Sequence, residues 1–600
     1  MTARKSFLFT TAFAALVTGC GGDGGNGVSS TPAPPTAAPP SAPPPPASNT
    51  SITELKANQT FANDGGTTNV SFNLASKTTI SGRAAPDPLT VRYDVATNSY
   101  SVSSAAFGET FSPADRQPDR QTGEALYQHT SAGTKSYLTL ATTPYFGNTA
   151  NKYVGLGYLQ RNLITGDRQD TSFTTFAYGL DTPSTGVPRS GKGQFAIDVL
   201  GLASFPGSEP SIFQGRGRFD VDFGAGLFST STGLTITGLV SGKGIVGGGI
   251  ELVGGGRLST SDGSFSGNVV YGSGAPSRLG GTLAGRFFGP NADELGASFA
   301  GSASDGSAFN GSFTGQRDTS LPPVNVSFAT LVTPQLFFGD ATTLTARTYK
   351  SGAAPQISDY PGLLGSATSR VQLEDQTSGN LSFGTPTSNL PGGQYTVTSI
   401  IAGDVNFTTY QKDISGQPTR LQLYKTGPAN RELALTYASF GQYSTSGTTD
   451  PIIATETNRV FFAYGFPTPS GLFANRTGTA NYAGVAYGAA ATPSGTIYDV
   501  TGTSQFGVDF SAMRLSGSLA LKTSGLATPI DYGSFAFSGP IYAFQSQGVA
   551  DIAGTGGTGR FLVNFYGPGG EEAAGPFRLR VADGVNAGTL INGVVASKRQ

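Results

Sequence analysis

Residues 287–299 read FFGPNADELGASF and residues 565–577 read FYGPGGEEAAGPF, so two distant parts of this 600-residue chain carry nearly the same segment. Each copy has a strand that ends in two aromatic residues, a Gly-Pro turn, an acidic pair and a returning strand. A repeat of nearly 300 residues is too long for a solenoid unit or a propeller blade. We therefore predict a tandem duplication into two lobes.

Other segments repeat in the same order, which extends the duplication over much of the chain. Two close matches are 176–184 (FAYGLDTPS) with 462–470 (FAYGFPTPS), and 219–223 (FDVDF) with 506–510 (FGVDF). A weaker match sets 140–147 (LATTPYFG) against 435–441 (LTYASFG). Because the order and the spacing are kept, we expect the two lobes to share one architecture.

The chain begins with the features of a secretory signal. Arg4 and Lys5 precede an apolar run at 7–17, which is shorter than a membrane-spanning helix requires. Small residues before a lone cysteine resemble the bacterial lipobox, here Val17, Thr18, Gly19 and Cys20. We expect residues 1–19 to be removed and Cys20, the only cysteine, to carry the lipid. The alternative is an ordinary signal peptide with an incidental cysteine.

Residues 20–50 are expected to form a lipidated, extended linker. Proline and glycine dominate this stretch, and proline-rich segments favour polyproline II over a packed core. Residue 21 is Gly rather than Asp, which by resemblance to Gram-negative lipoproteins indicates the outer membrane. We therefore expect the lipid on Cys20 to anchor the protein to the outer membrane.

Composition excludes several classes of function. The chain has 37 Lys and Arg against 38 Asp and Glu, and loss of Arg4 and Lys5 with the signal leaves a net charge of about −3. A nearly neutral protein is not expected to bind nucleic acid. With Cys20 lipidated, no disulfide can form. Period-two alternation, as in 194–200, 420–424 and 577–581, predicts an all-β protein of sandwiches or barrels.

Catalytic and metal-binding patterns are weak. His129 is the only histidine and cannot form a histidine cluster, so we interpret it as an exposed or half-buried strand residue. Residues 242–247 match GxGxxG, but no helical pattern follows, so a dinucleotide site is not expected. Asp220 and Asp222 share one strand face but only Asp509 is repeated, which favours solvated or barrel-rim residues. We predict no enzyme, no cofactor and no metal site.

The repeated turn has a structural interpretation. Pro290 and Pro568 lack an amide donor and end their strands. Glu294 and Glu572 follow the turn, where a carboxylate can accept backbone amide hydrogen bonds. The alternative is that the acidic pairs 293/294 and 571/572 bind a cation or act as acid and base. Repetition in both copies favours turn architecture.

The lipobox, the proline-rich leader, the two lobes and the closing turn together resemble the transferrin-binding protein B family. Members carry an aromatic-Gly-Pro-x-Ala-x-Glu-x-Gly-Gly segment, which this chain matches at Phe287, Phe288, Gly289, Pro290, Glu294 and Gly296, and at Phe565, Tyr566, Gly567, Pro568 and Glu572. The second copy departs at Gly569, Gly570, Ala574 and Gly575, so its turn geometry is the less certain.

The resemblance implies that each lobe is an irregular β handle domain followed by an eight-stranded antiparallel β-barrel. The expected domains are a signal peptide (1–19), the linker (20–50), a first handle (51–170), a first barrel (171–322), a second handle (323–457) and a second barrel (458–600). It also implies display on the outer surface and binding of a host or environmental protein or solute, often in iron acquisition. No ligand-binding residue can be named from it.

Three functions remain open at this point. The first is a surface lipoprotein that binds a protein or small solute, such as an iron or haem compound, through barrel and handle loops. The second is a structural or adhesive surface lipoprotein without a specific solute. The third, a barrel embedded in the membrane, is disfavoured because the chain has no Trp and ends in Lys598, Arg599 and Gln600 without a terminal aromatic.

Overall fold

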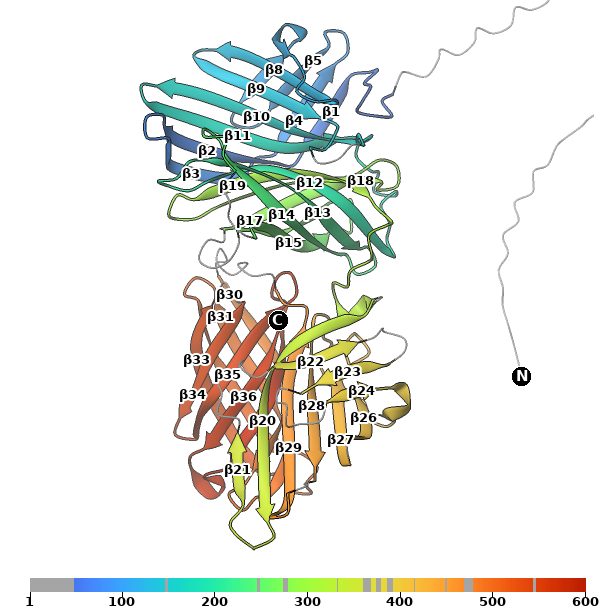
Figure 1. Ribbon diagram of the computed structural model, residues 1–600, viewed down its shortest axis with the longest axis vertical. Helices are drawn as coiled ribbons and strands as arrows, with labels where there is room; N and C mark the ends of the chain where they lie inside the picture. Colours follow the sequence, from blue (N-terminus) through green and yellow to red (C-terminus); the bar gives the residue numbers. More distant parts are fainter. Residues whose placement is uncertain are drawn as a thin grey trace, which may run out of the picture. The chain divides into compact units, whose positions relative to one another are not determined.

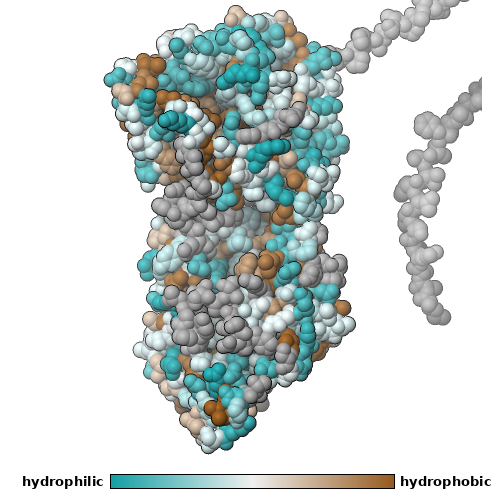
Figure 2. Space-filling model, in the orientation of Figure 1, coloured by the Kyte–Doolittle hydropathy of each residue, from teal (hydrophilic) through white to brown (hydrophobic). Residues whose placement is uncertain are grey.

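The computed structural model describes residues 48–600 apart from 146–148, 245–248, 273–278, 332, 360–367, 374–378, 386–391, 415, 448–449, 469–477 and 543–545. The expected signal peptide and lipobox, including Val17, Thr18, Gly19 and Cys20, lie outside these residues, as does nearly all of the linker. Residues 48–600 form one compact unit, which contains both copies of the repeat (Figure 1). Figure 2 shows hydrophilic and hydrophobic residues interspersed on the face in view.

The first handle contains two antiparallel sheets. One has the order β1-β4-β5-β6, with β1 at Gln59–Asn63, β4 at Leu89–Asp94, β5 at Ser99–Ser103 and β6 at Gly108–Phe111. The other has the order β3-β2-β11-β10-β9-β8-β7, with β2 at Gly65–Asn73, β3 at Thr78–Pro86, β7 at Arg116–Gln117, β8 at Glu124–Ser131, β9 at Thr134–Ala141, β10 at Val154–Thr165 and β11 at Arg168–Gly179. Leu138, Leu159 and Phe176 on one face of the larger sheet pack in a core with residues of the smaller sheet.

The first barrel closes because β19 pairs with β12. Its strands are β12 (Lys192–Ser204), β13 (Ser211–Asp222), β14 (Leu227–Gly238), β15 (Glu251–Leu258), β16 (Phe265–Gly272), β17 (Leu279–Phe288), β18 (Glu294–Ser302) and β19 (Ala308–Arg317). Aromatic rings fill the interior, with Phe219 4.9 Å from both Phe228 and Phe265 between ring centroids. Strands β18 and β19 are buried on both faces because their outer faces pack against the handle.

The second handle is one sheet with the order β24-β23-β22-β20-β29-β28-β27-β26-β25, and β21 pairs with β20. Its strands are β20 (Gln335–Tyr349), β21 (Gln356–Asp359), β22 (Thr368–Leu373), β23 (Leu381–Gly384), β24 (Gly393–Tyr395), β25 (Ile400–Ile401), β26 (Phe407–Ile414), β27 (Gln417–Tyr424), β28 (Ala438–Ser446) and β29 (Ile453–Gly465). The run β20-β29-β28-β27-β26 corresponds to β2-β11-β10-β9-β8 of the first handle.

The second barrel repeats the topology of the first, with β37 closing onto β30. Its strands are β30 (Thr479–Ala491), β31 (Ile497–Asp509), β32 (Arg514–Thr523), β33 (Asp531–Tyr542), β34 (Gln547–Gly554), β35 (Gly557–Tyr566), β36 (Glu572–Val581) and β37 (Leu590–Arg599). Tyr482 and Phe506 stack in its core at 5.0 Å, as counterparts of Phe195 and Phe219.

The fold class expected from sequence and resemblance is confirmed: the protein is all-β, and each lobe has handle sheets followed by a closed eight-stranded antiparallel barrel. Short 3₁₀ helices also occur in the described residues, at η1 (Pro113–Asp115), η2 (Phe328–Thr330), η3 (Val397–Ser399) and η5 (Gly584–Asn586). In the part of the chain that is described, no helix is long and apolar enough to cross a membrane.

The strands β11 and β29 pair within the handle sheets, although most of each lies in the expected barrel ranges 171–322 and 458–600. We therefore propose handle–barrel boundaries that follow the sheets, between β11 and β12 and between β29 and β30. Both strands carry the aromatic residues of the FAYG repeat, Phe176 and Tyr178 in the first lobe and Phe462 and Tyr464 in the second. These side chains are buried in the handle cores.

Candidate functional site

The two aromatic residues of each closing turn face opposite sides of the barrel wall, because successive strand residues alternate. Phe287 and Phe565 point into the barrel cores and are almost fully buried. Phe288 packs outside the first barrel against Val154 and Ala177 of the handle. Tyr566 does the same in the second lobe, within a core that includes handle residues. Each pair therefore joins the barrel core to the handle.

The glycine of each turn has a backbone that only glycine adopts easily. Gly289 has φ +82° and Gly567 has φ +84°. A Cβ atom on Gly289 would lie 2.5 Å from the ring of Tyr153, and one on Gly567 would lie 2.6 Å from the ring of Tyr437. The following Pro290 and Pro568 lie in the turn between the two strands, as their missing amide predicts.

Glu294 joins the first barrel to its handle. At the start of β18, its carboxylate accepts hydrogen bonds from the backbone amides of Lys152 (2.7 Å), Tyr153 (2.8 Å) and Val154 (2.8 Å). The expected acceptor role is thus present in the structure, but the donors come from the handle and not from the turn. Burial raises the pKa of Glu294, while the three amide hydrogen bonds oppose this shift.

Glu572 makes the same contact in the second lobe. Its carboxylate accepts the amides of Thr436 (2.7 Å), Tyr437 (2.8 Å) and Ala438 (2.8 Å), and burial raises its pKa. Despite the different residues of the second copy, the two turns share this feature of their geometry: Ala292 and Gly570 both have positive φ, at 55° and 63°. The acidic neighbours Asp293 and Glu571 accept the amides of Asn291 and Gly569 within the turns.

Both acidic pairs are therefore engaged by backbone amides, which supports the structural interpretation over a cation or acid–base site. Gly296 allows the barrel to pack closely on the handle, since a Cβ atom there would lie 2.5 Å from the Cβ of Ala177. Its second-lobe counterpart, Ala574, is fully buried.

These contacts also correct one pairing of the repeat. Tyr437 makes the contacts in the second lobe that Tyr153 makes in the first, so 435–441 corresponds to the start of β10. The match of 435–441 with 140–147 was wrong, because it rested on a short Phe-Gly pattern that is not specific to one position of the repeat. Strand β28 occupies the position of β10, and β27 that of β9.

The sequence also offered three other candidates, namely His129, the pair Asp220 and Asp222, and the GxGxxG match. His129 is half-buried on β8, as expected, and its Nε2 lies 3.7 Å from Glu109. Asp220 and Asp222 were expected to be solvated or barrel-rim residues: they lie at the end of β13, on the rim, but are only 4% and 2% exposed. Asp220 accepts hydrogen bonds from both Nε and Nη2 of Arg218. Residues 245–247 of the GxGxxG match lie outside the described residues. Within those described, no cluster of three or more His, Cys, Asp or Glu could hold a metal.

The first lobe contains an open groove of about 760 Å³ between the larger handle sheet and the barrel. Its floor is one face of the sheet, because residues in register across adjacent strands share a face. One row across the floor is Gln128, Tyr137, Gln160 and Phe173 on β8, β9, β10 and β11. Leu200, Ile212 and Gln214 of β12 and β13 form the barrel side. We call this cavity the first-lobe groove.

One end of the first-lobe groove holds a buried polar cluster. Glu124 is 3% exposed, and its Oε1 accepts a hydrogen bond from the hydroxyl of Tyr145 at 3.2 Å. Arg120 donates to the hydroxyl of Tyr158 at 3.1 Å, and its Nε lies 3.7 Å from Oε2 of Glu124. Among the described residues, Oε2 of Glu124 and Nε2 of Gln121 are buried without a hydrogen-bond partner.

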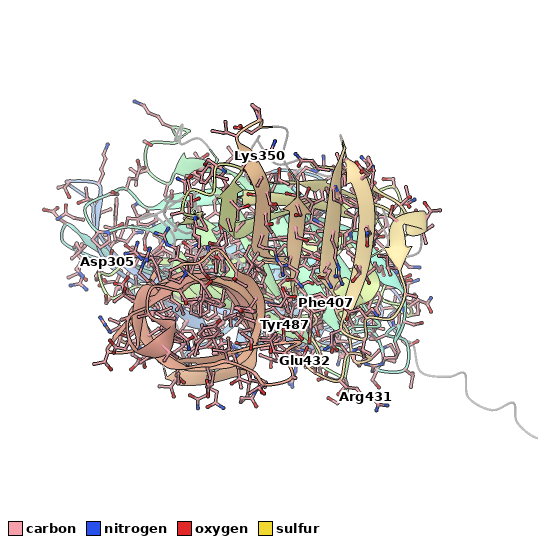
Figure 3. The ribbon with its side chains drawn as sticks, turned by 90° about the horizontal axis from the view of Figure 1, so that it is seen from below. Asp305, Lys350, Phe407, Arg431, Glu432 and Tyr487 are labelled. Atoms are coloured by element: carbon pink, nitrogen blue, oxygen red, sulfur yellow. The ribbon has the colours of Figure 1, made fainter. Side chains whose placement is uncertain are left out.

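The second lobe fills the corresponding space with aromatic rings. By sheet register and the glutamate contacts, Phe407, Tyr424, Phe440 and Tyr487 occupy the positions of Glu124, Ala141, Leu156 and Leu200. The rings of Tyr424 and Phe440 stack at 4.3 Å, and Phe407 lies 5.0 Å from Tyr487. Figure 3 shows Phe407, Tyr487 and Glu432 together where the handle sheet meets the barrel. The Tyr487 hydroxyl donates to Glu432, at 2.8 Å from Oε2 and 2.9 Å from Oε1.

The sequence did not reveal the first-lobe groove, because its walls come from strands far apart in the chain. A signal was present in the repeat: once the lobes are aligned through Tyr153 and Tyr437, four positions that are aromatic in the second lobe are Glu124, Ala141, Leu156 and Leu200 in the first. The smaller side chains at these positions are a signal for the groove, since Glu124 and Leu200 line it.

Comparison with known proteins gives matches among solved structures only. No protein-family model and no curated protein matches the chain. It is similar to a double mutant of transferrin-binding protein B from Haemophilus parasuis Hp5, with 17% identity, 77% of this chain and 85% of that chain covered, and a TM-score of 0.25. It is also similar to isotype 1 transferrin-binding protein B from serogroup B Neisseria meningitidis, with 17% identity, 76% of this chain and 87% of that chain covered, and a TM-score of 0.25. A third similar structure is the N-lobe domain of lactoferrin-binding protein B of Moraxella bovis, with 14% identity, 42% of this chain and 99% of that chain covered, and a TM-score of 0.20.

Proposed function

We propose that this protein is a lipoprotein of the outer membrane surface that binds a protein or small solute through its first lobe. The observation that carries the proposal is the difference between the two handle–barrel junctions. At the compared positions the second junction is filled by packed aromatic side chains, whereas the first keeps a groove of about 760 Å³ beside the packed Leu156, Phe173 and Leu200. Ligand sites are typically concave and of this size.

The sequence supports the anchoring part of the proposal. The lipobox at Val17, Thr18 and Gly19 precedes Cys20, and the proline-rich linker follows. A lipidated cysteine on an extended linker would hold the lobes at a distance from the bilayer. The resemblance of the closing turns to the transferrin-binding protein B family supports the same placement and, within this proposal, a ligand connected with iron or haem uptake.

The hairpin ends of the first handle offer a second contact region for a protein ligand. Leu163 and Ile164 at the end of β10 are 44% and 54% exposed, and Ile80 on β3 is 51% exposed. Exposed apolar side chains on loops of a rigid β scaffold are common in binding surfaces. This region and the first-lobe groove lie on the same sheet, through β10.

Two experiments test the proposal. Cys20→Ser should abolish incorporation of labelled fatty acid, and protease added to intact cells should digest the wild-type lobes. Protection of the lobes on intact cells would overturn surface display. The purified chain is then offered serum proteins, haem compounds and iron complexes, and bound material is identified. Capture that is lost when first-lobe residues are changed supports the binding function.

The alternative is a structural or adhesive lipoprotein without a specific solute. It predicts that no component of that panel is retained above background, although the lobes are displayed and folded. It also predicts that filling the first-lobe groove has no effect on any phenotype of the cells. That combination of results would replace the proposed function.

A further inference from the structure

We propose that the first-lobe groove binds a neutral oligosaccharide. This inference rests on the proposed function, because it names the chemistry of a ligand for the first lobe. It starts from the contrast between the lobes: at four corresponding positions the second lobe packs aromatic rings, whereas in the first lobe all four side chains are smaller and two of them, Glu124 and Leu200, line the groove.

The groove provides apolar ring faces beside polar groups. Tyr137 and Tyr158 are half-buried rings on the floor, and the buried Phe173 packs beside Tyr158 with ring centroids 5.8 Å apart. Ring faces of this kind accept the apolar C–H face of a pyranose, while the surrounding polar groups reach its hydroxyls. A purely apolar ligand would leave those polar groups without partners.

Amide side chains match the hydroxyl groups of a sugar. Gln128, Gln160, Asn162 and Gln214 line the groove, and each amide offers both donors and acceptors. A sugar hydroxyl also donates and accepts, so neighbouring hydroxyls can bond to one amide. Gln160 already donates to Asn162 at 3.1 Å, which fixes the orientation of both amides.

The charge of the groove favours a neutral ligand. Its two charged side chains, Arg120 and Glu124, lie close enough to compensate each other, with Nε 3.7 Å from Oε2. The lining residues therefore carry no net charge that would select an anion or a cation.

The dimensions favour an oligomer over a single sugar. The row Gln128, Tyr137, Gln160 and Phe173 crosses four strands, which corresponds to about 14 Å at the usual strand spacing. An extended peptide is the less suitable occupant, because peptides that join sheets pair with a free edge, and the groove presents the face of paired strands.

The test uses the full chain purified in detergent and titrated calorimetrically with maltohexaose, cellohexaose and chitohexaose, with a heparin hexasaccharide and an unstructured decapeptide for comparison. At least one neutral hexasaccharide should bind. Tyr137→Ala removes a ring from the floor, and Leu200→Tyr places in the groove the residue that the second lobe has at this position. Each should weaken binding at least about tenfold, a change of about 1.4 kcal/mol.

Tyr542→Ala is the matched control, because Tyr542 is an exposed tyrosine of the second barrel. It should leave binding unchanged, and circular dichroism should show all variants folded. The proposal is overturned if none of the neutral hexasaccharides binds, if only the heparin fragment or the peptide binds, or if binding survives both groove variants. Capture of a serum protein or iron compound by the wild-type chain, lost in these same groove variants, would then show that the binding function stands without the saccharide.

Discussion

The side-chain carboxylate of Glu294 lies 2.8 Å from the backbone nitrogen of Tyr153, although 141 positions separate the two residues in the chain. The amides of Lys152 and Val154 complete a set of three donors, and Glu572 repeats the set in the second lobe. The residue that follows the barrel turn is thus the residue that attaches the barrel to its handle. This gives the repeated acidic position a physical reason in both lobes.

Glu294→Gln should destabilise the first lobe by about 1–3 kcal/mol, because one acceptor oxygen becomes an NH₂ group that faces amide donors. Urea unfolding followed by circular dichroism measures the change, and Glu572→Gln should shift the transition of the second lobe. The control is Glu54→Gln, since the Glu54 side chain is 75% exposed, and it should change stability by less than about 0.5 kcal/mol. Equal stability of Glu294→Gln and wild type would contradict the attachment role.

The Glu294 carboxyl also predicts a pH dependence of known sign. Burial raises its folded-state pKa above the unfolded value of about 4.3, so the native state binds more protons between these two pKa values. The stability that this group contributes is therefore full below about pH 4.3 and is lost as the pH rises through the folded-state pKa. The free energy of unfolding of wild type minus that of Glu294→Gln should fall over this window. A difference that grows with pH would show that the amide bonds outweigh burial.

Gly289→Ala should be more destabilising than Gly166→Ala, although both glycines have positive φ, at 82° and 60°. A Cβ atom on Gly166 meets nothing within 4 Å, so that variant carries only backbone strain of about 1 kcal/mol. A Cβ atom on Gly289 lies 2.5 Å from the ring of Tyr153, which must move away from the turn. We expect a total loss of about 3 kcal/mol for Gly289→Ala, measured by thermal unfolding. Similar losses for both variants would remove the contact argument.

How far the sequence predicts this molecule depends on the range of the interactions. The repeat, the strand alternation and the Gly-Pro turns are local patterns, and they predicted two all-β lobes. The acceptor role of Glu294 could also be proposed, because carboxylates after turns accept amides. The donors to Glu294 could not be predicted, because the amides of residues 152–154 reach its carboxylate only when the handle packs on the barrel.

The first-lobe groove was beyond the sequence for a similar reason. Its floor depends on the register that places Tyr137 across from Gln160, and its far wall depends on Leu200 of the barrel. The place of Asp220 and Asp222 on the barrel rim could be expected, but their burial could not, because alternation alone does not show which strand ends are covered. Both are buried in the structure.

The aromatic closure of the second lobe predicts opposite outcomes for two exchanged residues. Tyr487→Leu removes a ring that packs 5.0 Å from Phe407 and also removes the hydrogen bonds to Glu432, so it should cost the second lobe about 2–4 kcal/mol. Tyr487→Phe keeps the ring and should lose only the hydrogen-bond part, about 1–2 kcal/mol. Leu200 packs with Leu156 and Phe173 and also lines the first-lobe groove, so the ring of Leu200→Tyr extends toward the groove and should cost about 1 kcal/mol. Urea unfolding of the three variants compares these changes. A large loss for Leu200→Tyr would show that the first junction is packed closed, whereas stability of Tyr487→Leu equal to wild type would show that the rings of the second junction contribute nothing to its closure.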